Sequence, residues 1–509
     1  MDVTQILMLI TILVYLAAMV GIGAVLAKQN QTTDDFYLGG RTLGPLVTAM
    51  SAEASDMSSW LLMGLPGVAY LSGTADAAWT AIGLAIGTYV NWLVVAKRLR
   101  NYTHVCGNST TLPLFFSNRY RDNKRILSVI AALLSIIFFV PYTASGFAAC
   151  GKLFANLFGM DYLPAMLISA IVIVAYTTLG GFLAASTTDF VQSIVMTIAI
   201  VVVFGFGISK VGSFSAVMDN AKSMAGYFSL THTHDVATGT ASPYSLLKIF
   251  STLAWGLGYF GMPHVLLRFM AIGDANKLKL SRRVATVWVV ISMAVSVFIG
   301  VIGNAMTKAG ILPTLKDPET IILVVADLIS KHGVLATIIA GLILAGILAA
   351  TMSTADSQLL AASSSASQNI LKEVFMKDMS EKTGMLIARI TVLVIALIGV
   401  FIARNPDSSV FQIVSFAWAG FGASFGPLVL LALFWKRSTF QGALCGMVSG
   451  GVMVFVWKFL IRPMGGALGI YELLPAFLLG LAVNVIVSLL TPAPSREVQD
   501  EFDKVASMK

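Results

Sequence analysis

The sequence predicts an all-α integral membrane protein with about thirteen transmembrane helices. Of its 509 residues, 57% are hydrophobic and only 11% are charged, far less polar surface than a soluble chain of this length needs. Apolar runs of about twenty residues recur from end to end, and such a run is typical of a membrane-spanning helix. The expected spans are 5–27, 43–71, 75–96, 125–157, 161–179, 186–210, 244–271, 284–306, 333–367, 383–403, 409–434, 438–461 and 470–491.

The basic residues predict how these helices cross the membrane. When the loops are assigned alternately to two sides, one side collects most of the Lys and Arg, and basic loops stay cytoplasmic. We therefore expect a protein of the cytoplasmic (inner) membrane with its N-terminus outside and its C-terminus inside, which requires an odd number of spans. The net charge of +8 follows this asymmetry and does not indicate a nucleic-acid partner. The first span is too long for a cleaved signal peptide, and the short, charged tail at 492–509 is expected to be solvated.

The segment 43–71 carries charges where a bilayer is driest. It contains Glu53 and Asp56 among the hydroxyls of a serine-rich stretch, within a run of Leu, Met, Val, Ala and Gly. A carboxylate at mid-membrane costs about 2.5–3.5 kcal/mol even on lenient scales, so spanning segments normally avoid one. A bound cation is the simplest reason to keep that charge.

A second segment, 244–271, is interrupted in a comparable way. Three glycines and Pro263 fall within eight residues, and they weaken a helix and free backbone carbonyl and amide groups. In lipid, such groups persist only where they face a cavity or a ligand. The two interrupted segments lie five spans apart and run in opposite directions, which is typical of the midplane site of a secondary transporter. We therefore expect inverted five-helix repeats at about 43–210 and 244–434, with peripheral helices at 5–27, 438–461 and 470–491. Glycines that simply permit close helix packing remain an alternative.

A third polar cluster lies in the span 333–367. Ser353 and Ser357 share one helical face, with Thr354 beside it and Asp356 nearby. Sodium is a hard cation that prefers oxygen ligands, which hydroxyls and freed carbonyls supply. Serine and threonine in a membrane helix otherwise bond back to their own backbone, so the cation hypothesis depends on pairing this cluster with the segment 43–71.

Several motifs resemble one transporter family. They are Arg41-Thr42-Leu43-Gly44-Pro45, the run Ser51–Trp60 followed by Leu61–Gly67, Trp255–His264, Ser415–Gly422, and Trp435-Lys436-Arg437 with Gly442-Ala443. Together they look like the bacterial sodium/proline symporters of the sodium/solute symporter family, over nearly the whole chain. The resemblance implies a leucine-transporter-type fold, co-transport of sodium with L-proline across the lipid bilayer, no enzymatic activity and no obligatory protein partner.

The resemblance also implies roles for particular residues. Sodium would be held by carbonyl or hydroxyl oxygens of five residues: Ala54, Met57, Ala350, Ser353 and Thr354. Ion coupling would involve the essential carboxylate Asp56 together with Arg41, Ser51, Ser55, Ser58 and Asp189. Proline would lie against Trp60, Tyr142, Trp255, Tyr259 and Pro263, because aromatic faces suit a pyrrolidine ring and its protonated amine.

Two acids depart from the pattern of that family. Glu53 stands where a small or neutral residue is expected, and Asp356 adds a charge beside Ser353. Each could pair with a basic residue, while Glu53 could also line a water path or alter the choice of ion, so proton coupling stays open. A sister symporter of another amino acid, of pantothenate or of a sugar is the alternative function. A channel and a transport-like sensor are disfavoured, because a continuous polar stripe and a signalling domain are missing from the sequence.

Overall fold

A computed structural model describes residues 2–28, 32–375, 380–405 and 409–508. The helices of the first half are α1 (Val3–Ala27), α2 (Thr33–Leu38), α3 (Pro45–Asp56), α4 (Leu65–Ser72), α5 (Thr74–Val90), α6 (Ala96–Val105), α7 (Leu112–Arg119), α8 (Ile126–Phe158), α9 (Tyr162–Val211) and α10 (Phe214–Ser223). Those of the second half are α11 (Leu246–Leu253), α12 (Pro263–Ala271), α13 (Leu278–Lys308), α14 (Ile321–Ser330), α15 (Val334–Ser364), α16 (Glu381–Ala403), α17 (Val410–Phe434), α18 (Phe440–Val456), α19 (Leu473–Leu490) and α20 (Arg496–Ser507). A small antiparallel hairpin, β1 (His232–His234) with β2 (Ala241–Pro243), lies in the connection before α11.

Ten helices of the described chain are long and apolar enough to cross a membrane. They coincide with ten of the expected spans, so the chain is a multi-pass, nearly all-helical membrane protein. The other three expected spans, 43–71, 161–179 and 244–271, contain helices that are short or interrupted. The span 161–179 continues into the next expected span, because α9 runs over fifty residues and leaves helical geometry only at Gly181 (φ 64°).

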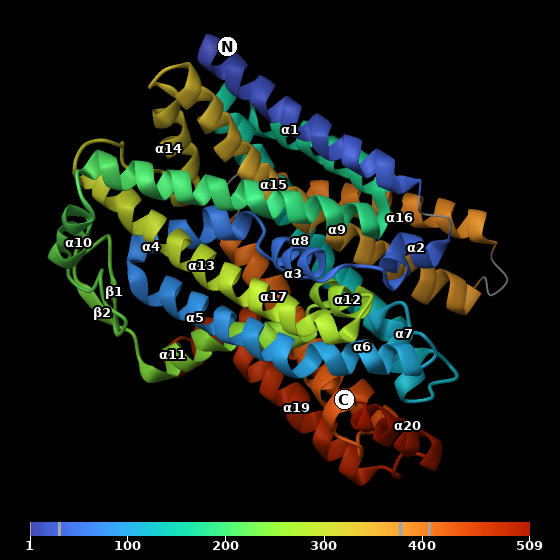
Figure 1. The fold of residues 1–509 in the computed structure, drawn as a ribbon. Helices are drawn as coiled ribbons and strands as arrows, with labels where there is room; N and C mark the ends of the chain where they lie inside the picture. Colours follow the sequence, from blue (N-terminus) through green and yellow to red (C-terminus); the bar gives the residue numbers. More distant parts are fainter. Residues whose placement is uncertain (1, 29–31, 376–379, 406–408, 509) are drawn as a thin grey trace.

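The long helices lie side by side and their connections gather at two ends (Figure 1). At one end lie α10, α11, α14 and the β hairpin, and at the other lie α2 and α7. The interrupted stretches are enclosed within this layer, since α3 packs against α9, α13, α12 and α15. Their polar groups are therefore separated from lipid by other helices.

The charged residues of the tail are largely exposed, as expected, but the segment also forms a helix with one buried side. Residues Arg496–Ser507 form the amphipathic helix α20, which buries Phe502 against the guanidinium of Arg98 at 4.8 Å. Glu497 and Glu501 accept from Arg121 at 3.0 Å and 2.8 Å, and Lys436 pairs with Asp503. This helix was not predicted, because an apolar stripe every three to four residues lies among the charges of a short segment. Lys509, the last residue of the expected tail, lies outside the described residues.

Candidate functional site

The first interrupted segment breaks directly after Asp56. Pro45 begins α3, and helical geometry is lost at Met57 (φ −76°, ψ 60°) before a π-helical turn at Trp60–Gly64 leads into α4. The Ser58 N–H donates to Asp56 O at 2.8 Å, and the Ser58 hydroxyl accepts from Trp60 N at 3.1 Å. The serine thus stabilises the turn, and the last carbonyls of α3 are released from the helix.

The second interrupted segment is a 3-10 stretch at Ala254–Gly261 between α11 and α12. Its glycines also permit close approach: a Cβ on Gly256 would overlap the Gly83 carbonyl, and one on Gly258 would overlap the Trp418 indole. These glycines therefore have both of the predicted effects. They interrupt the regular helix, and they permit close packing of the backbone.

The structure brings four of the five predicted sodium residues into direct contact. The Ser353 hydroxyl donates to Ala54 O at 2.8 Å and lies 3.2 Å from Ala350 O, while the Thr354 hydroxyl lies 3.5 Å from Ala54 O. Met57 lies at the break itself, where its N–H donates to Glu53 O at 2.7 Å. These oxygens come from α3 and α15, which are almost 300 residues apart in the chain.

Asp56 connects this oxygen cluster to the predicted substrate residues. Its Oδ2 accepts from the Tyr259 hydroxyl at 2.6 Å, and its carbonyl accepts from the Tyr142 hydroxyl at 3.3 Å. Asp56 is 5% exposed, and its Oδ1 has no hydrogen-bond partner among the described residues. The carboxylate therefore lies between the broken end of α3 and two tyrosines of other elements.

Two of the predicted aromatic residues, Trp60 and Trp255, form a cluster with other rings. The ring centroids of Trp60 and Trp255 are 5.6 Å apart, and Trp255 also packs on Phe411 at 5.5 Å and on Tyr471 at 5.1 Å. Pro263 is the first residue of α12 and is buried. A cavity of about 330 Å³ borders this cluster, and Trp255, Phe411 and Tyr471 form part of its lining.

A buried ionic network lies about one helical turn from the oxygen cluster, along both α3 and α15. The Ser51 hydroxyl donates to Asp189 Oδ2 at 2.7 Å, and Arg268 donates to Ser51 Oγ at 3.0 Å and to Asp189 Oδ2 at 3.2 Å. Arg268 also donates to Ser357 Oγ at 2.5 Å, and that hydroxyl lies 3.2 Å from Asp356 Oδ1. Ser51 and Asp189 therefore meet as members of one network, with a guanidinium at its centre.

Two of the predicted coupling residues lie apart from these contacts. The Ser55 hydroxyl donates to Ala52 O at 3.0 Å, which is an ordinary bond back to its own helix. Arg41 (φ 57°) donates to Met270 O at 2.6 Å and to Ser109 O at 2.8 Å, and so ties the start of α3 to the end of α12. Burial lowers the pKa of the Arg41 guanidinium to about 10, and the neighbouring Arg100 charge adds to the effect.

The two acids that depart from the family pattern have different surroundings. Glu53 accepts from the indole N–H of Trp92 at 2.8 Å, so pairing with a basic residue was the wrong expectation for it. Trp92 is the partner of Glu53 because the neighbouring turn, Asn91–Val95, carries no cation. Asp356 belongs to the network of Arg268 described above.

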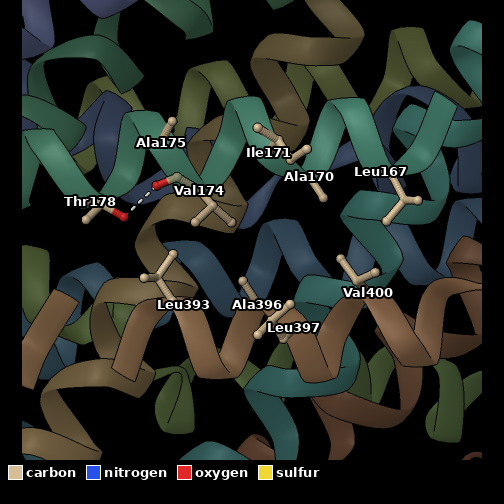
Figure 2. Close-up of a pocket in the computed structure, with 10 residues that line it drawn as sticks. All are labelled: Leu167, Ala170, Ile171, Val174, Ala175, Thr178, Leu393, Ala396, Leu397 and Val400. Carbon is tan, nitrogen blue, oxygen red and sulfur yellow. Dashed lines mark hydrogen bonds between the residues drawn. The ribbon is translucent and has the colours of Figure 1, made fainter. Parts of the chain in front are cut away.

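An apolar groove between α9 and α16 is not a candidate site. Its volume is about 640 Å³, and aliphatic side chains from the two helices line it (Figure 2). The hydroxyl of Thr178 is satisfied by Val174 O at 2.6 Å, so it is not free to orient a ligand. In a bilayer, such a surface suits lipid chains.

The comparison with known families decides the class of this protein. Residues 36–450 match the model of the sodium:solute symporter family. The chain belongs to that family. The sequence resemblance is thereby confirmed at the level of the family.

Relatives of this family member are similar over nearly their whole length. The sodium/proline symporter of Salmonella typhimurium is 41% identical over 502 residues, which cover 98% of this chain and 96% of the relative. The sodium/proline symporter of Escherichia coli is 41% identical over 500 residues (97% and 95%). The osmoregulated proline transporter OpuE of Bacillus subtilis is 40% identical over 489 residues (96% and 96%).

Solved structures agree on the fold of the family member. A Na+-coupled sialic acid symporter in a substrate-bound outward-open state superposes with a TM-score of 0.78 at 18% identity, covering 96% of this chain and 99% of that one. A nucleobase-cation-symport-1 family transporter in a closed conformation gives 0.54 at 15% identity (92% and 98%). The relatives and these neighbours are transporters.

Sequence reasoning missed several residues of the site in this symporter-family chain. Arg268 is the most important of them, and the signal was present, because a charge within an apolar span is functional by default. Trp92, Phe411 and Tyr471 gave no comparable signal, since an aromatic residue in a membrane helix usually just packs.

Proposed function

We propose that this protein carries L-proline into the cell together with sodium, by alternating access across the cytoplasmic (inner) membrane. The relatives named as sodium/proline symporters support the substrate and the ion. The observation that carries the proposal is the position of Asp56, whose carboxylate binds Tyr259 while its helix end meets the hydroxyls of α15.

The proposed sodium site consists of Ala54, Met57, Ala350, Ser353 and Thr354. The contacts of Ser353 with Ala54 O and Ala350 O support it, because hydroxyl and carbonyl oxygens a few ångströms apart suit a hard cation. Asp56 supplies negative charge near this cluster without joining it. Sodium would hold α3 against α15 and so stabilise one arrangement of two elements that move against each other.

The proposed proline site uses Trp60, Tyr142, Trp255, Tyr259 and Pro263. Trp60 and Trp255 pack together with ring centroids 5.6 Å apart, and aromatic faces of this kind suit the apolar ring of the substrate and its cationic amine.

The driving force follows from the charge of the cargo. Proline is a neutral zwitterion, so each transport cycle with one sodium ion moves one positive charge inward. The membrane potential contributes about 2.3 kcal/mol per charge per 100 mV, which concentrates a neutral solute tens-fold before any sodium gradient is added.

The proposed topology has thirteen spans with the N-terminus outside and the C-terminus in the cytoplasm. The ten long helices together with the three short or interrupted stretches support that number. Inverted repeats at about 43–210 and 244–434 would place both breaks at equivalent positions, with α1, α18 and α19 peripheral.

Transport by purified protein in liposomes tests the proposal. Labelled proline is offered with a sodium, lithium, potassium or proton gradient imposed separately, and the sodium gradient should drive accumulation. Unlabelled amino acids, pantothenate and sugars are added as competitors, and proline should compete best. Equal uptake with choline in place of sodium, and with no drive from protons, would exclude sodium symport.

The variant Asp56→Asn adds a test of the site itself. It should sharply lower the sodium affinity while the protein still reaches the membrane, whereas Tyr259→Phe keeps the charge and should alter proline affinity more than sodium affinity. Sodium dependence that is unchanged in Asp56→Asn would remove this carboxylate from the mechanism.

A further inference from the structure

We propose that Glu53 and Asp56, together with Thr88 and Asn91, form a second sodium site next to the one at Ala54. The inference rests on the proposed sodium coupling and adds a second ion to it. The site lies between α3, the end of α5 and the 3-10 stretch Ala254–Gly261.

The two carboxyl groups lack any cation to balance them. Glu53 is 1% exposed and Asp56 is 5% exposed, and neither forms an ion pair within the described part of the chain. Each accepts one neutral hydrogen bond, Glu53 from Trp92 and Asp56 from Tyr259. A buried carboxylate without a partner is costly, so these groups call for a positive charge.

Four buried oxygens around these groups have no hydrogen-bond partner in the described structure. They are Oε2 of Glu53, Oδ1 of Asp56, Oγ1 of Thr88 and Oδ1 of Asn91. All four side chains are at most 5% exposed. Because protein interiors leave few polar atoms unsatisfied, a group of four such atoms requires an explanation such as a bound ion.

Hydrogen bonds fix these residues around one another. Trp92 donates to Glu53 at 2.8 Å, Asn91 donates its amide N–H to Tyr259 O at 3.2 Å, and the Tyr259 hydroxyl donates to Asp56 at 2.6 Å. Thr88 lies about one turn before Trp92, and its hydroxyl lies beside the hydroxyl of Tyr259. The contacts therefore form a closed path from α3 to the end of α5, on to the 3-10 stretch and back to α3.

Close packing encloses this path. A Cβ added to Gly87 would overlap the Gly256 backbone, so only glycines allow α5 and the 3-10 stretch to come this near. The oxygens available as ligands belong to carboxylate, hydroxyl and amide groups, which suit a hard monovalent cation. By contrast, the buried acid Asp189 pairs with the guanidinium of Arg268, which also reaches Asp356 through the hydroxyl of Ser357.

Counting bound and transported sodium tests the proposal. Equilibrium binding of radioactive sodium to the purified full-length protein should give two ions per chain. In the same preparation, the sodium activation of proline uptake should be steeper than first order.

The variant Glu53→Gln keeps the acceptor for Trp92 and removes the charge. It should bind one sodium ion per chain and show first-order activation, whereas Ser353→Ala should weaken binding of the other ion about ten-fold. Glu497→Gln, on the exposed face of α20, is the matched control and should retain both. If Glu53→Gln does not fold, Thr88→Val should weaken one of the two ions by about ten-fold, as expected for the loss of one polar ligand.

The outcomes separate this inference from the proposed function. One sodium ion per wild-type chain, or two ions in a folded Glu53→Gln protein, would overturn the second site. The same would hold if protons, rather than sodium, provided the second charge. Only failure of sodium to drive proline uptake in the wild type would overturn the proposed function.

Discussion

Removing the guanidinium of Arg268 should destabilise the protein more than almost any other single polar change. This side chain is 1% exposed and makes four hydrogen bonds, to Ser51, His264 O, Asp189 and Ser357. In Arg268→Gln, Asp189 stays buried without its cation, and breaking a buried ion pair from one side costs about 3–5 kcal/mol. Four hydrogen bonds to a charged group, at about 1.5–3 kcal/mol each, would add up to more, so about 3–5 kcal/mol is the smaller of the two expectations.

The free energy of unfolding, from denaturing-detergent titration of the purified variants, measures this loss. A double-mutant cycle of Arg268→Gln with Asp189→Asn should show coupling of about 1–3 kcal/mol, because the double variant leaves no unpaired charge on either partner. The matched control is Arg283→Gln, an exposed arginine of α13, which should change stability by about 0.5 kcal/mol or less. A loss below about 1 kcal/mol in Arg268→Gln, or additive effects in the cycle, would refute the reasoning.

Four further substitutions probe the contacts between elements. Ser353→Ala and Thr354→Val should each raise the sodium concentration for half-maximal uptake about ten-fold, while the proline affinity at saturating sodium stays nearly unchanged. An unchanged sodium requirement would contradict the proposed ligands. Gly258→Ala should cost about 1–3 kcal/mol of stability and reduce proline uptake, because its Cβ overlaps an indole, whereas Gly205→Ala has open space and should be tolerated in the same assays. Trp418→Phe should lose about 1–3 kcal/mol in detergent titration, since it leaves a buried carbonyl of the second break without its donor; a neutral effect would show that this bond does not support the break.

Much of the architecture could be predicted from local sequence alone. Apolar runs of membrane length predict spanning helices without knowledge of their neighbours, because lipid requires each segment to satisfy its own backbone. The breaks at Met57 and near Pro263 could also be predicted, since glycine, proline and buried acids disfavour a continuous helix wherever they occur. The family motifs then predicted that Ala54 and Ser353 belong together, and the structure places them in contact.

Which polar groups meet across helices was decided only by tertiary packing. A helix that is apolar on all sides gives no period from which to deduce the face it turns to a neighbour. For that reason Arg268 was not matched with Asp189, and Trp92 was not matched with Glu53. The same limit applied to α20, whose apolar stripe has meaning only once Arg98 and Arg121 are placed beside it. Sequence therefore determined that this is a membrane protein, where its spans lie, and which kinds of side chain occur at the site. Packing between distant segments determined which polar side chains are paired with one another and which are left to bind an ion.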